Sequence, residues 1–457
     1  MGRRCTRMAI VLGLLAPALS CRDTAESGLP AGEAPPASTV YFGDPHVHTG
    51  VSEDGCSADL GEIDASCNAF SDIVDFAVGQ GLTWFVLTDH VNGEKFRTAA
   101  GAEDDWRRTV DAALSASGVL VLPGAEVFLE TASDPLGHRS VFFFADALPG
   151  LQRVTVGPSG VSSYVDSCAA VQAWTRDLEA RFGPVLLVPH HPAAPSPMPT
   201  DWDCLTENDA AVEVYSQWGN SLRVGSAAQP WASYDAMVGD AGSRDPAAGT
   251  VYQALTKRRD HPLGFMAGTD HHDTTPGAVC TPWSESKYGG GLTGVALPEG
   301  VPLSRASLFE AIKARHTYAT TGPRVPVEVA VFDASGAYVG GMGDLVDRTG
   351  RITFRVTVDS PEVWDDELRG VTTILPVGGD PETDVRRALV RVAPGVFEGV
   401  VDVPGGASTH IPVYVELLLD GPNAHPPGCV DEPVGQAVEA TERVWTSPTW
   451  FGPPSPG

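Results

Sequence analysis

A repeated alternation of strand-like and helix-like segments constrains the fold most. Short apolar runs such as Leu82–Leu87 and Val185–Val188 alternate, over about 280 residues, with stretches whose apolar residues recur at helical spacing, such as Asn68–Gly79. This alternation is typical of an α/β fold with a parallel core. In such folds functional groups lie at the carboxyl ends of the strands.

Histidine and acidic residues follow several of the predicted strands. In the stretch Thr39–Gly55 an apolar run leads into His46 and His48, which point the same way if the segment is extended. Similar transitions occur at the ends of later strands, in Leu82–His90, Val119–Glu126 and Leu263–Asp273. The resulting candidate metal ligands are His46, His48, Asp54, His90, Glu126, His138, His191, Asp270 and His272.

These candidates are all nitrogen or oxygen donors. Such donors suit zinc, manganese or iron, and the sequence does not choose among them. Each residue alone has an ordinary explanation, as a cap, a hydrogen-bonded loop histidine or a rim carboxylate. Their recurrence at strand ends favours a shared metal site instead.

The sequence pattern changes at about residue 325. Short alternating runs separated by Gly, Pro and Asp predict a C-terminal antiparallel β domain over residues 325–457, with no major helix. The α/β part is expected over residues 39–324.

The N-terminal residues resemble an export signal. A basic segment and a short apolar core end at Cys21, as in a bacterial lipoprotein signal over residues 1–21, and residues 22–38 have the composition of a flexible tether. We expect a periplasmic or outer-surface lipoprotein anchored only through Cys21, with ordinary secretion as the alternative.

Cysteine content and charge fit this expectation. Six cysteines remain after the signal and tether, so disulfides are expected, with Cys56–Cys67 as the local candidate pair and the other pairings open. The formal net charge of −28 argues against nucleic acid as a partner, because an acidic surface repels phosphate backbones.

A succession of motifs resembles the PHP superfamily, named for polymerase and histidinol phosphatase, and within it a secreted bacterial branch of unknown function. The motifs span about Val40 to Thr321, with a closing WTSPTWF; in order they are GDPHVHTGVSEDG, LTDH, PGAE, GHRSVFF, VPHHP, EVYSQWGNS, GTDHHD, GGLTGV and ARHTYATTGPR. The resemblance implies a distorted seven-stranded β/α barrel that holds two or three divalent metal ions.

The resemblance also implies three ligand groups. His46, His48, Glu126 and Asp270 would hold one ion; Asp54, His90 and His272 a second; and Glu126, His138 and His191 a third, with Glu126 bridging. Two assignments stay open, because His190 competes with His191 and Glu53 competes with Asp54.

The function expected from such a site is metal-dependent hydrolysis of a small phosphoester, with a metal-bound hydroxide as nucleophile. Arg139 is a candidate phosphate or transition-state contact, with a solvated surface arginine as the alternative, and His271 is a candidate acid or base. Two other functions are open: a carboxylic ester or amide hydrolase, and a surface-anchored binding protein with structural metals.

Overall fold

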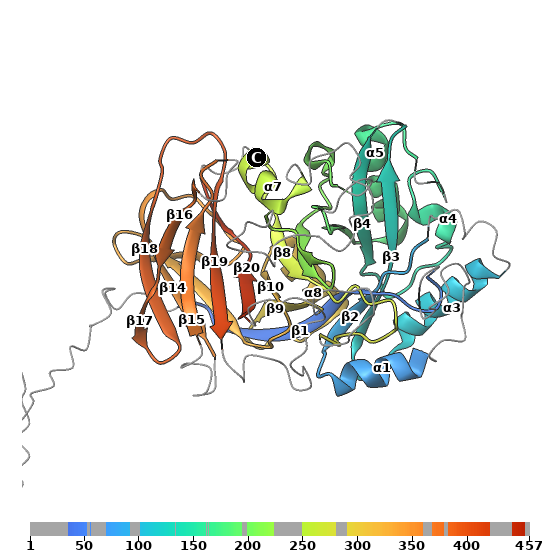
Figure 1. The fold of residues 1–457 in the computed structure, drawn as a ribbon. Coiled ribbons are helices and arrows are strands. Elements are labelled where there is room, and N and C mark those ends of the chain that lie inside the picture. The colour runs from blue at the N-terminus through green and yellow to red at the C-terminus, as the bar shows by residue number, and fades with distance from the viewer. Residues whose placement is uncertain are drawn as a thin grey trace, which may run out of the picture.

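The computed structural model describes residues 35–52, 55, 70–91, 101–132, 134–160, 162, 164–193, 199–223, 249–279, 290–359, 368–378, 383–420 and 441–452. Within these residues the chain is a mixed α/β protein with a large mixed sheet and a separate antiparallel sheet. In Figure 1 the orange and red C-terminal strands lie on one side, the green strands β3 and β4 on the other, and β1, β9 and β10 between them.

The elements of the N-terminal part have the following bounds: β1 (Ser38–Val47), α1 (Phe70–Gly79), β2 (Trp84–Leu87), α3 (Ala102–Ser115), β3 (Leu120–Glu130), β4 (Pro135–Phe143), α4 (Arg153–Val156), α5 (Cys168–Phe182), β5 (Val185–His190), the 3-10 helix η1 (Trp202–Cys204), β6 (Ala211–Ser216), β7 (Gly219–Asn220), α7 (Val251–Lys257), β8 (Gly264–Ala267), β9 (Leu292–Pro298), α8 (Arg305–Lys313) and β10 (Thr317–Thr320).

The C-terminal part contains β11 (Val327–Phe332), β12 (Tyr338–Gly341), β13 (Leu345–Val346), β14 (Gly350–Val358), β15 (Leu368–Leu375), β16 (Val385–Ala388), β17 (Val390–Ala393), β18 (Val396–Val403), β19 (Ile411–Asp420), β20 (Thr441–Thr446) and β21 (Thr449–Phe451).

Strand directions in the N-terminal part are mixed. β1, β2 and β3 are parallel neighbours, as are β6 and β8, but β4 runs antiparallel to both β3 and β5, and β9 runs antiparallel to β1. The expected parallel arrangement is therefore present in β1 to β3 and in the β6–β8 pair, and the expectation is wrong for β4 and β9. Because β3 leads to β4 through a short connection rather than a helix, the two strands pair as a hairpin.

The C-terminal strands divide between two sheets. β12, β11, β14, β18 and β17 form a five-stranded antiparallel sheet, whereas β20 pairs with β10 and so joins β19 and its neighbours to the large sheet. An apolar core that includes Phe354, Leu417 and Phe451 lies between the two sheets. Pairing with β10 makes these C-terminal strands structurally continuous with the sheet that carries β1.

Helices cover the outer faces of β2 to β5. Trp106 of α3 and Trp174 of α5 pack in one core with Val127 of β3, while Leu308 and Phe309 of α8 pack in another with Trp84 of β2. Gly43 of β1 permits this second arrangement, because a Cβ atom there would lie 2.2 Å from the Trp84 ring.

Side chains cap the starts of two helices. The Ser167 side chain accepts a hydrogen bond from the Ala170 N–H at the start of α5. At the start of α8, Ser304 and Ser307 form a reciprocal pair, in which each side chain accepts a hydrogen bond from the other residue's backbone N–H.

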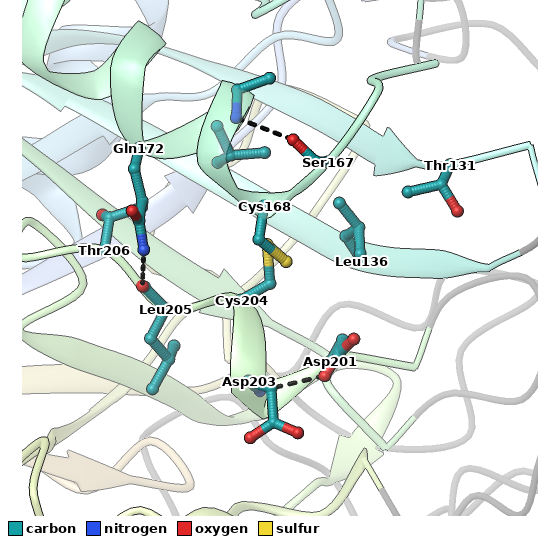
Figure 2. Close-up of a disulfide and its surroundings, with 12 residues drawn as sticks. Thr131, Leu136, Ser167, Cys168, Gln172, Asp201, Asp203, Cys204, Leu205 and Thr206 are labelled. Atoms are coloured by element: carbon teal, nitrogen blue, oxygen red, sulfur yellow. Dashed lines mark hydrogen bonds between the residues drawn. A yellow bond between two sulfur atoms is a disulfide. The ribbon is translucent and has the colours of Figure 1, made fainter.

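A disulfide joins Cys168, at the start of α5, to Cys204 in η1 (Figure 2). Gln172 on the next turn of α5 donates to the Leu205 carbonyl at 3.5 Å, so the same two segments are also linked by a hydrogen bond. The predicted pair Cys56–Cys67 lies outside the described residues.

Candidate metal centre

Strand ends bring the metal-donor side chains together. His46 lies next to the end of β1, with His48 just beyond it, and His90 follows β2; the remaining donors come from β3, β4, the end of β5 and the turn after β8, namely Glu126, His138, His190, His191, Asp270 and His272. All of these side chains are buried. They form four overlapping groups, one of which also includes Glu213 of β6, and in each group one donor atom from each residue lies within 4.8 Å of the others.

The first group contains His46, His48, Glu126 and Asp270. The Nε2 atom of His46 lies 3.2 Å from His48 Nε2, 3.2 Å from Glu126 Oε2 and 3.3 Å from Asp270 Oδ1. His48 Nε2 lies 3.4 Å from Glu126 Oε2 and 3.3 Å from Asp270 Oδ1. These separations match a tetrahedron with metal–ligand bonds of 2.0–2.1 Å, whose edges measure about 3.3 Å. The four residues therefore fit a single divalent ion.

Glu126 connects this group to another. Its Oε2 atom faces His46 and His48, whereas its Oε1 atom lies 3.1 Å from His138 Nδ1 and 3.3 Å from His190 Nε2. His191 completes the group of Glu126, His138 and His190. A carboxylate with its two oxygens in separate donor groups is suited to bridging two ions.

A third group consists of His48, His90 and His272. His48 contacts both other rings, with centroids 4.7 Å from His90 and 4.2 Å from His272. Asp54, predicted here as a ligand, and its alternative Glu53 both lie outside the described residues.

Strand register explains why both His190 and His191 reach the centre. His190 pairs directly with His138 across β4 and β5, so the two side chains lie on the same face. His191 would point away if β5 continued, but its φ of 26° turns the chain, and its Nε2 lies 3.6 Å from Asp270 Oδ2. The choice between these histidines is thus not exclusive in this structure.

Asp270 also has a left-handed backbone, with φ of 55°. Its carbonyl accepts a hydrogen bond from the Gln217 side-chain amide, and its N–H donates to the His46 carbonyl at 2.9 Å. Residues held in such sparsely populated conformations cluster at functional sites.

Electrostatics place charge where a cation would bind. Burial raises the pKa of Glu126, but its interactions with the surrounding histidines, of which that with His90 is the largest, outweigh burial, so the pKa of this carboxyl lies well below its usual range. Burial also raises the pKa of Asp270, but the interaction with His46 outweighs burial, so the pKa of Asp270 is lowered. Burial lowers the pKa of His190 and His191 well below the ordinary value. Ionised carboxylates and neutral imidazoles are the forms that bind metals.

His46 titrates in the opposite direction. Burial lowers its pKa, but the charges of Asp270 and Glu213 outweigh burial and raise the pKa well above the ordinary value. In the absence of cations, a protonated His46 balances part of the surrounding negative charge.

Three buried carboxylates that sequence reasoning did not single out support the centre. Asp44 accepts from the Thr269 hydroxyl at 2.6 Å, Asp89 accepts from the Thr49 N–H at 2.7 Å, and Glu213 Oε2 lies 2.9 Å from His46 Nδ1. Each carboxylate belongs to one of the motifs quoted above. Asp89 follows β2, and this strand-end position was a signal in the sequence, whereas Asp44 and Glu213 lie within β1 and β6.

The two predicted catalytic residues lie beside the donor groups rather than within them. Arg139 is buried, on the opposite face of β4 from His138, and its Nε donates to Asp209 Oδ1 at 2.9 Å. The His271 carbonyl accepts from the His48 N–H at 3.2 Å, and its Nδ1 lies 3.4 Å from the Thr275 hydroxyl. Arg139 thus has a buried acidic partner, and the solvated alternative is wrong.

Comparison with known proteins adds little about activity. No protein-family model matches the chain. An uncharacterized protein of Chlamydia pneumoniae is 33% identical over 135 residues, which make up 29% of this chain and 19% of that protein. An uncharacterized protein of Chlamydia trachomatis serovar D is 34% identical over 129 residues, or 28% of this chain and 19% of that protein. The chain thus covers about a fifth of the length of these relatives.

Within the described part of the chain, no helix combines the length and the apolar character needed to cross a membrane.

Proposed function

We propose that this protein is a metal-dependent hydrolase that cleaves a small phosphoester with two or three bound divalent ions. The observation that carries the proposal is the tetrahedral spacing of His46, His48, Glu126 and Asp270, joined through the second oxygen of Glu126 to the His138 and His190 group. Zinc, manganese and iron all suit these donors.

The donor residues would act mainly by holding the metal ions and fixing their positions. His46, His48 and Asp270 would hold one ion, and His138, His190 and His191 a neighbouring one, with Glu126 between them. Bound divalent ions would supply a water activated near neutral pH and positive charge for the phosphoryl oxygens. The burial of these donors strengthens every charge interaction among them, because the local dielectric constant is lower than that of water.

We also propose membership of the PHP superfamily and its seven-stranded barrel. The order of donors along the chain supports this, as do two isolated bridges. Leu187 of β5 pairs with Asp209 just before β6, and Val47 of β1 pairs with His271 just after β8. Together with the β1 to β5 ladders and the β6–β8 pair, these bridges support a closed arrangement of seven strands.

Export as a lipoprotein anchored at Cys21 completes the proposal. The Cys168–Cys204 disulfide supports an oxidising compartment. No nucleic-acid partner is proposed, since the net charge is −28.

Metal analysis of the purified protein, paired with a panel of phosphomonoesters and phosphodiesters, tests this function. Asp270→Asn should lose roughly 10-fold to 100-fold or more in metal affinity and lose turnover, while the fold is retained because Asn tolerates a positive φ. Asp402→Asn, a substitution at an exposed position on β18, is the matched control and should leave metal affinity and turnover unchanged. A metal-loaded parent that hydrolyses no member of the panel would contradict the phosphoesterase and favour a binding protein.

A further inference from the structure

We propose that Glu213 is a positioning residue that holds the His46 ring with Nε2 directed at the metal. This inference rests on the metal centre proposed above and adds a residue outside the expected ligand set. Glu213 lies on β6, is 2% exposed and comes from a segment far from His46 in sequence.

The two nitrogens of His46 have different surroundings. Nε2 lies 3.2 Å from Glu126 Oε2 and 3.3 Å from Asp270 Oδ1, whereas Nδ1 lies 2.9 Å from Glu213 Oε2. A neutral imidazole carries one N–H, so a ring that binds a cation through Nε2 must carry its proton on Nδ1. That N–H then donates to the Glu213 carboxylate, at an ordinary hydrogen-bond distance.

The surrounding backbone leaves room for this contact and little more. A Cβ atom at Gly268 would lie 2.6 Å from His46 Cβ and 2.9 Å from Glu213 Oε2. On another side, the His190 ring meets the His46 ring edge-on, with centroids 4.4 Å apart. The His46 ring is therefore confined, and Glu213 is the acceptor within reach of its Nδ1.

Such outer carboxylates fix the tautomer of a ligating histidine and increase its basicity. Glu213 would thus raise the affinity of the ion held by His46 without touching that ion. The other reading is that Glu213 is itself a ligand, since a donor atom of Glu213 also lies within 4.8 Å of donors from His46, His190 and Asp270. The 2.9 Å contact between Glu213 Oε2 and His46 Nδ1 favours the positioning role, because it gives Nδ1 a hydrogen-bond partner and leaves Nε2 for the ion.

Cobalt(II) binding separates these readings. Affinity is measured by competition with a chromophoric chelator, and the visible spectrum reports the ligand geometry. Glu213→Ala should lower the affinity for one cobalt ion roughly 10-fold to 100-fold. Glu213→Gln should weaken it less, because the amide oxygen still accepts from Nδ1–H, and its spectrum should match that of the parent. Glu398→Gln is the control, since Glu398 is a buried carboxylate paired with Arg355 in the five-stranded sheet.

Three results would overturn the proposal. If Glu213→Ala binds every ion with the parent affinity and spectrum, the positioning role is wrong while the metal centre stands. If Glu213→Gln abolishes the binding of one cobalt ion and changes the visible spectrum as much as Glu213→Ala does, Glu213 is a ligand. If the parent binds no cobalt, the metal centre and this inference fail together. Because Glu213→Gln preserves side-chain size, it keeps the test valid if Glu213→Ala does not fold.

Discussion

The Nε2 atoms of His46 and His48 lie 3.2 Å apart in a fully buried setting. At that distance two neutral imidazole rings form a hydrogen bond only if one Nε2 carries a hydrogen and donates it to the other. Each Nε2 also faces the carboxylates of Glu126 and Asp270. The separation equals, within about 0.1 Å, the edge expected for two nitrogens on one tetrahedral ion. This pair links strand geometry to metal binding.

Removing metal should destabilise the protein. Ligands that bind only the folded state stabilise it by about 2.7 kcal/mol per site when free metal is 100 times the dissociation constant. Thermal unfolding before and after chelator treatment measures the loss, and restoring zinc or manganese should reverse it. Superimposable unfolding curves for treated and untreated protein, with metal content shown to differ, would contradict this prediction.

In the metal-free protein, the contribution of His190 to stability should decrease as the pH falls below about 6.5, the unfolded-state pKa of histidine. Because burial lowers the pKa of His190, the unfolded chain binds a proton that the folded protein excludes, so acid favours unfolding. His190→Gln should reduce the slope of the free energy of unfolding against pH by up to about 1.4 kcal/mol per pH unit, as measured by urea unfolding between about pH 5 and 6.5.

Glu213 acts in the opposite sense throughout that range, because burial raises its pKa from 4.5 to about 7. Its folded form keeps a proton that the unfolded chain releases, so its contribution falls as the pH rises through this window. Glu213 is present in both proteins, and its effect cancels when their slopes are compared. Equal slopes for the parent and His190→Gln would refute the prediction.

The disulfide should contribute about 2–4 kcal/mol, since it closes a loop between residues 36 apart in sequence. Cys204→Ser should lower the free energy of unfolding by this amount in urea. Cys168→Ser should have the same effect, and the double variant should be no less stable than either single variant, because all three lack the same bond. Additive losses would show that the two cysteines stabilise the fold independently.

Arg139 should matter for stability rather than for substrate contact. Its Nε is paired with Asp209 in a buried setting, and removal of one partner from such a pair typically costs about 3–5 kcal/mol. Arg139→Ala and Asp209→Asn should therefore both lower the urea midpoint. Turnover per folded molecule should stay near the parent value in both. A stable Arg139→Ala protein with greatly reduced phosphoester turnover would restore the role of substrate contact.

Much of the candidate centre was predictable because its donors follow recognisable strands. His46 and His48 are two residues apart and follow an apolar run, and Asp270 and His272 repeat that spacing after β8. Period-two alternation makes the first pair converge whatever the distant contacts are, whereas the second pair lies in a turn in which Asp270 has a positive φ. The structure brings eight of the nine predicted ligands into the donor groups, and the ninth, Asp54, lies outside the described residues.

The direction of strands β4 and β5 was not predictable from their composition. Apolar runs such as VFFF suit parallel and antiparallel strands equally, and the direction depends on whether the connection crosses over or turns back.

The amino-acid sequence by itself determined which side chains could bind metal and that most of them would stand at strand ends, because both follow from residue chemistry and local periodicity. Tertiary structure decided how they meet. The register of β4 against β5 puts His190 opposite His138, the positive φ of His191 turns that residue inward, and β6 places Glu213 behind His46. These relationships depend on contacts between residues distant in sequence, which no local pattern specifies.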